Sequence, residues 1–410
     1  MPEQRKIEDR KGGVAARDGA SRDGAKRTRV LMVAPSLGIL GGQAVQAARL
    51  LERLRKEPEL EIDFLPVNPQ LPGVLGRLQA IKYVRTVLTS AAYVAALLRR
   101  VRRYDVVHIF SASYFSFLLA PTPAILVSRL YGKRTILNYR SGEAEDHLQR
   151  WRRTALPVMR MADSIIAPSG YLVDVFKRFG LDAGYIYNIV ETERFRFRER
   201  SPLKPVFFSN RNFEPLYNVA CTLRAFAFIQ KRYREARLVL AGDGSLRAEL
   251  EALARELNLR NVEFIGRVKP ERMHELYDAA DVYLNSPDID NMPGSIIEAF
   301  ASGLPVVTTN AGGIPYIVTD GSTGLMVERN DHEALAEAAL RLLEDPALAT
   351  SLARAGLDEC RKYCWDAVRG QWVNLYCELA RSKQRGAHEE AKSLDGEELA
   401  VKREEEALSR

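Results

Sequence analysis

Two acidic residues stand eight positions apart in the stretch DIDNMPGSIIEAFASGLPVVTTNAGGIP, which spans residues 288–315. They are Asp290 and Glu298, and the sequence Pro-Gly-Ser between them is typical of the start of a helix. The free N–H groups of a helix start attract phosphate oxygens, and a carboxylate one turn further on can accept hydrogen bonds from ribose hydroxyls. The stretch therefore has the residue types of a nucleotide site, with Asp290 on a loop that would project into a cleft. An acid in this place can also do no more than stabilise the helix dipole, so one acid alone does not make a site.

Glycines follow several predicted strands in the same half of the chain. Gly242 and Gly244 lie in AGDGSLRAELE, FIGRV occupies residues 264–268, and Gly312 and Gly313 lie in NAGGIP. The sequence AGDG resembles a phosphate-binding turn but lacks the full GxGxxG pattern. Each is an ordinary strand-to-helix turn when taken alone, but several glycine-bearing ends at one edge of a sheet favour a nucleotide site.

The elements that would position these residues form two series of alternating strands and helices. The chain has 410 residues, enough for two domains, and a charged, proline-bearing stretch at residues 188–205 separates the series. The predicted strands are apolar throughout, which indicates parallel sheets covered by helices on both faces. We therefore predict an N-terminal α/β domain over residues 27–200 and a C-terminal α/β domain over residues 201–364. Ligands of such sheets bind at the carboxyl ends of the strands, so the cleft between the domains is the expected site.

Three further segments fall outside the two predicted domains. Residues 1–26 are charged and poor in apolar side chains, so we predict a disordered arm. Residues 365–381 carry apolar side chains at helical spacing and should form a helix that packs back across the domains. Residues 382–410 are charged and rich in alanine, which is typical of a solvated helix or a disordered tail.

Composition narrows the possible functions. The formal net charge of +7 favours anionic partners, but no nucleic-acid-binding module is recognisable, so we expect no nucleic acid partner. The four cysteines lack the spacing of a zinc site, and the DID sequence of residues 288–290 belongs to the acidic loop, so we predict no metal site. The apolar runs are too short to cross a bilayer, and the charged N-terminal stretch lacks the apolar core of a secretion signal. We therefore expect a cytoplasmic protein.

The order of several motifs resembles a known enzyme family. AGDG, EFIGRV, ADVYLNSP, DNMPGSIIEAFASGLPVVTTNAGGIP and GLMVERND follow one another as in the C-terminal domain of the retaining GT-B glycosyltransferases of family 4, the glycosyl transferases group 1. A GG pair after the first strand, DVVH midway and a closing WDAV…QWVNLY helix extend the resemblance over most of the chain. It implies two Rossmann-like parallel α/β domains that face a cleft, with the acceptor in the first and a nucleotide-sugar in the second. It also implies metal-independent sugar transfer with retention, no cofactor, and a nucleotide-diphosphate sugar, most commonly UDP-linked, as donor.

The resemblance assigns roles to individual residues. Asp290, where the family usually has Glu, would lie near the transferred sugar, and Glu298 would hold the donor ribose. Arg211 would neutralise the diphosphate, because its guanidinium is always charged and matches phosphate oxygens. With the glycines noted above, the residues predicted to line the donor site are Gly41, Gly42, Gly242, Gly244, Arg267, Val268, Gly294 and Ser295.

Three positions depart from the family pattern, and one of them is Tyr316, which replaces the acid usually found after GGIP. The Lys that commonly follows the Arg is absent, and Tyr217 or Asn218 stands in its place. The His often found after the strand TILNY is Arg140, so Arg140, His108 or His147 would take its catalytic role. A lone histidine at a strand end, such as His108, is as often structural as catalytic. These departures keep two alternatives open, a catalytically silent nucleotide-sugar-binding protein and a GT-B-type sugar-nucleotide epimerase.

One amphipathic stretch is not explained by the donor site. Residues Arg77–Arg103 contain seven basic residues and no acidic residue, and their apolar positions recur at near-helical spacing. Basic amphipathic helices lie on anionic membranes. A helix that faces the core with a solvated basic side has the same pattern. The possible partners are therefore a glycan or lipid-linked acceptor and, through this helix, an anionic membrane surface on the inner face.

Overall fold

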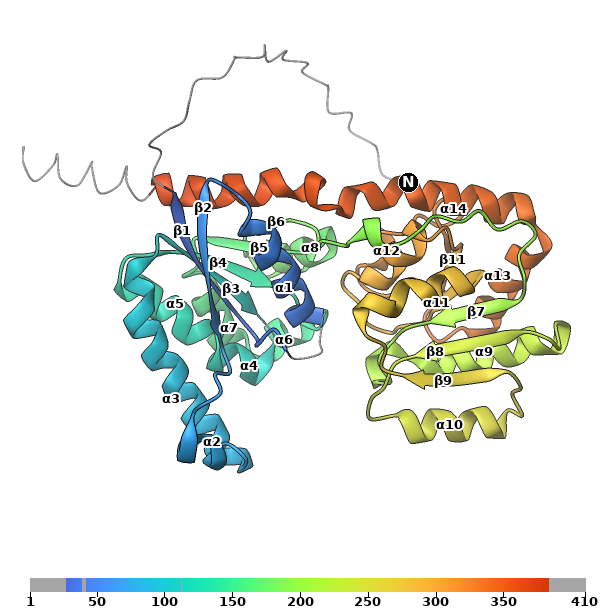
Figure 1. Cartoon of the computed structure of the whole chain (residues 1–410), viewed down its shortest axis with the longest axis horizontal. Helices are drawn as coiled ribbons and strands as arrows, with labels where there is room; N and C mark the ends of the chain where they lie inside the picture. The colour runs from blue at the N-terminus through green and yellow to red at the C-terminus, as the bar shows by residue number, and fades with distance from the viewer. Residues whose placement is uncertain (1–26, 39–41, 112, 383–410) are drawn as a thin grey trace, which may run out of the picture.

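The computed structural model describes residues 27–38, 42–111 and 113–382 of the chain. The predicted arm at residues 1–26, nearly all of the predicted tail and Gly41 lie outside these residues. Two parallel sheets with their covering helices stand side by side (Figure 1). This arrangement confirms the predicted fold class of two Rossmann-like α/β domains.

Six parallel strands form the N-terminal sheet in the order β2-β1-β3-β4-β5-β6. The strands are β1 (Thr28–Ala34), β2 (Leu60–Pro66), β3 (Val106–Ser111), β4 (Arg134–Tyr139), β5 (Ser164–Ala167) and β6 (Gly184–Tyr185). The chain moves from β1 to β2 on one side and then returns to β3 on the other, so the strand order reverses between β1 and β3. Loops at the carboxyl ends of two such strands border a crevice in which ligands bind.

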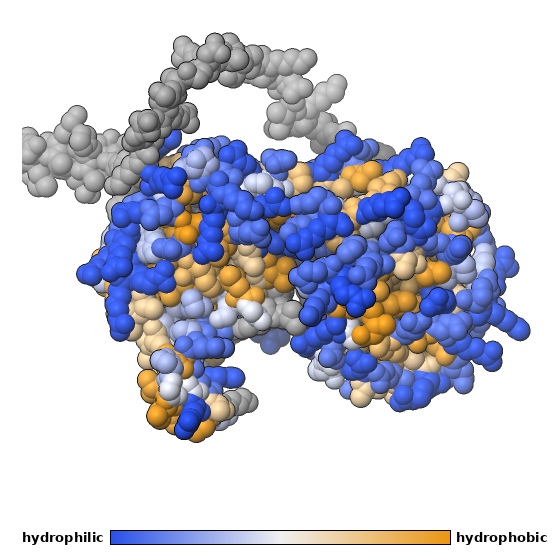
Figure 2. Space-filling model, viewed as in Figure 1, coloured by the Kyte–Doolittle hydropathy of each residue, from blue (hydrophilic) through white to orange (hydrophobic). Residues whose placement is uncertain are grey.

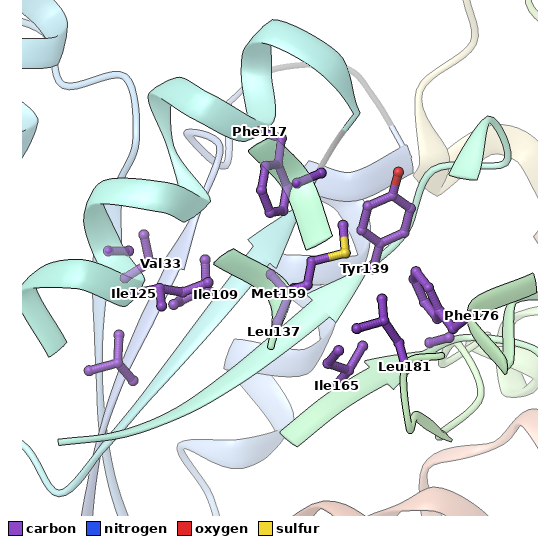
Figure 3. Close-up of a cluster of buried hydrophobic side chains, with 14 of the residues drawn as sticks. Val33, Ile109, Phe117, Ile125, Leu137, Tyr139, Met159, Ile165, Phe176 and Leu181 are labelled. Carbon is purple, nitrogen blue, oxygen red and sulfur yellow. The ribbon is translucent and has the colours of Figure 1, made fainter. Parts of the chain in front are cut away.

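Most helices of the N-terminal domain pack on the two faces of this sheet, and the second of them contacts the third instead. The helices are α1 (Gly42–Leu54), α2 (Gly73–Leu78), α3 (Lys82–Arg100), α4 (Tyr114–Leu119), α5 (Pro121–Leu130), α6 (Ala144–Arg150), α7 (Arg152–Met159) and α8 (Gly170–Arg178). Successive β1 side chains point to opposite faces, so Val33 joins one buried cluster and Met32 the other. Figure 3 shows the first cluster, in which Val33, Ile109 and Leu137 of the sheet face helical side chains.

The C-terminal sheet also has six parallel strands, in the order β12-β11-β10-β7-β8-β9. The strands are β7 (Val206–Ser209), β8 (Arg237–Ala241), β9 (Val262–Gly266), β10 (Val282–Asn285), β11 (Val306–Thr309) and β12 (Leu325–Val327). Its helices are α9 (Val219–Arg232), α10 (Arg247–Glu256), α11 (Met273–Ala279), α12 (Gly294–Ala301), α13 (His332–Glu344) and α14 (Pro346–Cys360). This is the strand order of dinucleotide-binding folds, and its reversal lies between β7 and β10.

The last described helix joins the two halves. It covers residues 365–382 and runs along the upper edge of the N-terminal domain (Figure 1). Its side chains Val368, Trp372 and Tyr376 are buried in the cluster that contains Val30 and Met32 of β1. The helix at residues 365–382 therefore completes the core of the N-terminal domain.

Candidate functional site

A cleft of about 540 Å³ lies between the domains. Its C-terminal wall includes loops that follow β7 and β10, and its N-terminal wall includes α1 and the loop after β4. The predicted site residues that line it are Gly42, Arg140, Arg211, Val268, Asp290, Gly294, Ser295 and Glu298. The predicted site residues that are described but do not line it are His108, Gly242, Gly244 and Arg267.

Arg211 and Asp290 form an ion pair at the strand reversal of the C-terminal sheet. Arg211 follows β7 and Asp290 follows β10, so two neighbouring strands bring them together. Arg211 Nη2 donates to Asp290 Oδ2, and Nη1 donates to Ser295 Oγ at 3.1 Å. Burial alone would lower the pKa of Arg211, but the carboxylate of Asp290 raises it above its ordinary value, so the guanidinium is always charged. Its Nε is buried without a partner among the described residues, so one donor remains free for a ligand.

Tyr217 occupies the place where the family commonly has a lysine. The guanidinium carbon of Arg211 lies 4.1 Å from the centre of the Tyr217 ring, in a cation–π contact. The ring holds Arg211 in the wall of the cleft but brings no charge of its own. A second positive charge at the site must therefore come from another residue.

The acidic loop rests on the double glycine that follows β11. A side chain at Gly313 would place its Cβ 1.8 Å from the carbonyl oxygen of Asn291, and one at Gly312 would lie 2.1 Å from that of Asp290. The N–H of Gly313 donates to the same Asp290 carbonyl at 2.9 Å. These glycines, noted in the sequence among the glycine-bearing strand ends, let two loops approach closely and so fix the position of Asp290.

Helix α12 begins at Gly294, directly after the acidic loop. No side chain caps this end of the helix, and both Gly294 and Ser295 line the cleft. A helix start of this kind offers backbone N–H groups to an anion. The structure thus places the predicted anion site beside Arg211.

Glu298 lies one turn into α12 and lines the same cleft. Its Oε2 accepts a hydrogen bond from the hydroxyl of Tyr277 at 3.0 Å, and its Oε1 lies 3.7 Å from Nη2 of Arg49. Burial raises the pKa of Glu298 above its ordinary value, and the charge of Arg49 opposes that shift. An ionised Glu298 can therefore accept bonds from ligand hydroxyls while Arg49 balances its charge.

Arg49 is a site residue that the sequence did not reveal. It lies on α1 of the N-terminal domain and pairs with Glu191 at 3.2 Å as well as with Glu298. Gly42, Gln46 and Arg49 all line the cleft, and their spacing of four and three residues places them on one face of α1. This spacing could have identified Arg49 from the sequence. Its pairing with Glu298 could not be identified in this way, because the two residues meet only in the folded protein.

Arg140 is a partly buried cation on the opposite wall of the cleft. Its Nη1 donates to Asn138 Oδ1 at 3.3 Å, its guanidinium lies 5.2 Å from the centre of the Phe110 ring, and Nη2 is buried without a partner. Within the described part of the chain, no carboxylate forms an ion pair with it. Burial lowers the pKa of Arg140 to about 9, so it is still positively charged at neutral pH. Arg140 is a candidate for the second positive charge of the site.

His108 and His147 lie in the core and away from the cleft. Nδ1 of His108 lies 2.6 Å from the hydroxyl of Tyr376, Nε2 lies 2.9 Å from Nδ2 of Asn138, and the side chain is fully buried. Burial lowers the pKa of His108 to about 3 and that of His147, whose Nδ1 lies 2.8 Å from the hydroxyl of Tyr139, to about 4. His108 therefore anchors the C-terminal helix to the sheet, which contradicts its prediction as a catalytic residue.

Gly242, Gly244 and Arg267 also lie outside the cleft wall. A side chain at Gly242 would place its Cβ 2.1 Å from the carbonyl oxygen of Arg211, and one at Gly244 would lie 2.5 Å from that of Phe213. Both glycines therefore allow the loop after β8 to approach the backbone that carries Arg211, and they act on the site through that residue. The side chain of Arg267 is 58% exposed, whereas its neighbour Val268 lines the cleft.

The described residues contain no group of three His, Cys, Asp or Glu side chains that could hold a metal ion. The DID sequence of residues 288–290 does not gather further ligands there. At this edge of the C-terminal sheet, Asp290 of that sequence pairs with Arg211. The charged side chains that line the cleft are the arginines Arg49, Arg140, Arg194 and Arg211 and the carboxylates of Glu143, Asp290 and Glu298, beside the start of α12.

Comparison with known proteins identifies the family. A model of the glycosyl transferases group 1 matches residues 191–358, and a model of glycosyltransferase family 4 matches residues 40–194. A phosphatidyl-myo-inositol mannosyltransferase of Mycobacterium leprae is 26% identical over 387 residues, which covers 86% of this chain and 98% of that protein. A D-inositol 3-phosphate glycosyltransferase of Corynebacterium aurimucosum is 33% identical over 164 residues, 38% of this chain and only 39% of that protein.

Solved structures share the fold at low sequence identity. HepE of Anabaena in complex with UDP-glucose has a TM-score of 0.67 and 18% identity, covering 87% of this chain and 100% of that chain. Sucrose-phosphate synthase from Thermosynechococcus elongatus has a TM-score of 0.71 and 20% identity, also covering 87% and 100%. Since the two family models together match residues 40–358 and both domains have the GT-B arrangement, the chain belongs to the group 1 glycosyltransferases.

Proposed function

We propose that this protein is a retaining, metal-independent glycosyltransferase that moves a sugar from a nucleotide-diphosphate sugar to a glycan or lipid-linked acceptor. The observation that carries the proposal is the cluster of Arg211, Ser295 and Glu298 at one end of α12. A helix start and a guanidinium fit a diphosphate, and a carboxylate one turn further on fits a ribose. These three groups succeed one another in the order of a nucleoside diphosphate.

The proposed chemistry follows from the charge of the leaving group. The bond between the anomeric carbon and the diphosphate oxygen breaks, a bond to the acceptor oxygen forms on the same face, and the acceptor proton goes to the released diphosphate. Arg211 and the N–H groups of α12 stabilise the negative charge that grows on the diphosphate. Asp290 pairs with Arg211 before the donor binds, so the diphosphate competes for that cation and leaves Asp290 beside the sugar.

Similar proteins indicate which donors and acceptors should be tested first. HepE was solved with UDP and with UDP-glucose, which makes UDP the first base to test. The mannosyltransferase of M. leprae is named for a phosphatidyl-myo-inositol acceptor. A lipid-linked acceptor would bring this protein to a membrane surface as a peripheral protein.

The test is donor turnover with and without an acceptor. Purified protein is first screened by thermal shift against UDP-, GDP- and ADP-linked sugars, because a ligand at a hundred times its Kd stabilises the native state by about 2.7 kcal/mol. We expect the stabilising donor to be consumed only when an acceptor is added. NMR should show that the product keeps the anomeric configuration of the donor, and a chelator should not change the rate.

The two alternatives give different outcomes in the same experiment. An epimerase would convert the donor without an acceptor, and a silent binding protein would be stabilised by the donor without consuming it. An inverted anomeric configuration or a rate abolished by the chelator would contradict the proposed mechanism while leaving the transferase assignment intact.

A further inference from the structure

An apolar surface projects from the N-terminal domain on the side away from the C-terminal helix. Helix α2 and the start of α3 extend beyond the body of the domain (Figure 1), and apolar side chains gather at the end of this projection (Figure 2). We call this surface the apolar tip; its members and exposed fractions are Val74 70%, Leu75 48%, Leu78 38%, Ile81 54%, Tyr83 79% and Val87 68%. Helix α2 contains no buried residue, so the apolar tip does not belong to the core.

The C-terminal part of α3 is fixed in the core. Tyr93 and Leu97 of α3 are fully buried, and the hydroxyl of Tyr93 donates to the carbonyl of Ala120 at 2.9 Å. Ten residues separate Tyr93 from Tyr83, so the tip stands about 15 Å further along the helix axis. Helix α3 thus holds the apolar tip away from the rest of the protein. Without a partner, water surrounds these side chains.

The charges around the tip show which partner fits it. The sequence between Asp63 and Asp105 contains seven basic residues and no acidic one. Among the described residues, neither Arg77 of α2 nor Arg85 of α3 forms an ion pair. A run of cations without acids is attracted to anionic lipid headgroups. Apolar side chains at the same place can insert into the boundary between headgroups and acyl chains.

We propose that the apolar tip is a membrane anchor, which inserts its side chains into an anionic bilayer while Arg77 and Arg85 contact the headgroups. No helix among the described residues is both long enough and apolar enough to cross a bilayer, so this mode is attachment to the surface. The anchor goes beyond the donor chemistry proposed above, because none of its residues lines the cleft.

The sequence indicated the whole stretch Arg77–Arg103 as a membrane-binding helix, and the structure favours its first part. The arginine cluster at the other end of the helix, Arg99–Arg103, lies near the buried base of α3. There Arg100 donates to the carbonyl of Phe64 at 3.1 Å and to the hydroxyl of Tyr104 at 3.3 Å. The basic residues that accompany exposed apolar side chains are instead Arg77 and Arg85.

Vesicle co-sedimentation with matched variants tests the anchor. The tip variant carries Ile81→Ser, Tyr83→Ser and Val87→Ser, and the base variant carries Arg99→Gln, Arg102→Gln and Arg103→Gln. Vesicles contain phosphatidylcholine alone or with phosphatidylglycerol, at low and at high salt. We expect wild type to bind the anionic vesicles, the tip variant to lose about tenfold or more in partitioning, and the base variant to lose less.

A fluorescent variant measures insertion directly. Tyr83→Trp should shift its emission to shorter wavelength on anionic vesicles, because an inserted indole leaves water. The proposal is overturned if the wild type does not bind vesicles, or if the base variant loses binding and the tip variant keeps it. It is also overturned if light scattering shows a wild-type dimer that the tip variant abolishes without vesicles, since the tip would then bind a second copy. Nucleotide affinity, measured in parallel, should be equal in all variants; its complete absence would instead contradict the proposed function.

Discussion

Replacing Arg211 by alanine should lower the affinity for a nucleoside diphosphate by about a hundredfold or more, which corresponds to about 2.7 kcal/mol. Two causes act together. The diphosphate loses its guanidinium donor, and Asp290, only 12% exposed at its side chain, is left as an unpaired negative charge in the anion site. Calorimetry with UDP and GDP measures the loss, and circular dichroism checks that the variant is folded.

A double variant separates these causes. Arg211→Ala with Asp290→Asn removes the unpaired charge, so it should recover part of the affinity that the single variant loses. Arg211→Lys keeps the charge but loses the planar fork whose two Nη atoms reach Asp290 and Ser295, so its affinity should fall between those of wild type and alanine. Normal diphosphate binding by Arg211→Ala would show that another cation holds the diphosphate, and Arg140 would be the first to examine.

Glu298→Ala should weaken nucleotide binding by roughly 1–3 kcal/mol, because the ribose hydroxyls lose their acceptor. Comparison of UDP with its 2′,3′-dideoxy analogue isolates this contribution. Wild type should prefer the ribonucleotide, whereas the variant should bind both alike. Equal preference in wild type and variant would remove Glu298 from the ribose site.

The preference for the ribonucleotide should also depend on pH. A protonated Glu298 is a poor acceptor, so the preference should fall as pH falls through the pKa of Glu298, which burial raises above 4.5. The same raised pKa means that ionised Glu298 lowers the free energy of unfolding at neutral pH. This loss of stability disappears below the pKa that Glu298 has in the unfolded chain. Because Arg49 favours the ionised form, Arg49→Gln should move the loss of ribose preference to higher pH, while Arg49→Lys should move it less.

The two-domain fold and the location of the donor site followed from local sequence. Strands buried on both faces must be apolar throughout, and residues after such strands meet at one sheet edge, so the place of Asp290 and Glu298 could be predicted without coordinates. Arg211 was predicted through the resemblance to family 4. The structure places all three in one cleft. The start of α12 could also be predicted, since Pro-Gly-Ser favours a helix start at its own place in the sequence.

Contacts between distant segments could not be predicted in this way. His108 is buried because Tyr376, far along the chain, packs on it, and Arg49 pairs with Glu298 because α1 lies across the cleft from α12. The glycines at 312 and 313 read locally as an ordinary glycine-bearing strand end, and only their close approach to the acidic loop shows that they support Asp290.

The basic helix shows the same limit most clearly. Its sequence fits both a core helix and a membrane-binding helix, and the structure shows one buried part and one exposed part: Tyr93 is fully buried, whereas Tyr83 on the same helix is 79% exposed. The sequence by itself determined which side chains are apolar, charged or small, and therefore which elements form and which sheet edge carries the chemistry. The tertiary structure decided which of those side chains other segments cover, because burial depends on neighbours that are distant in sequence.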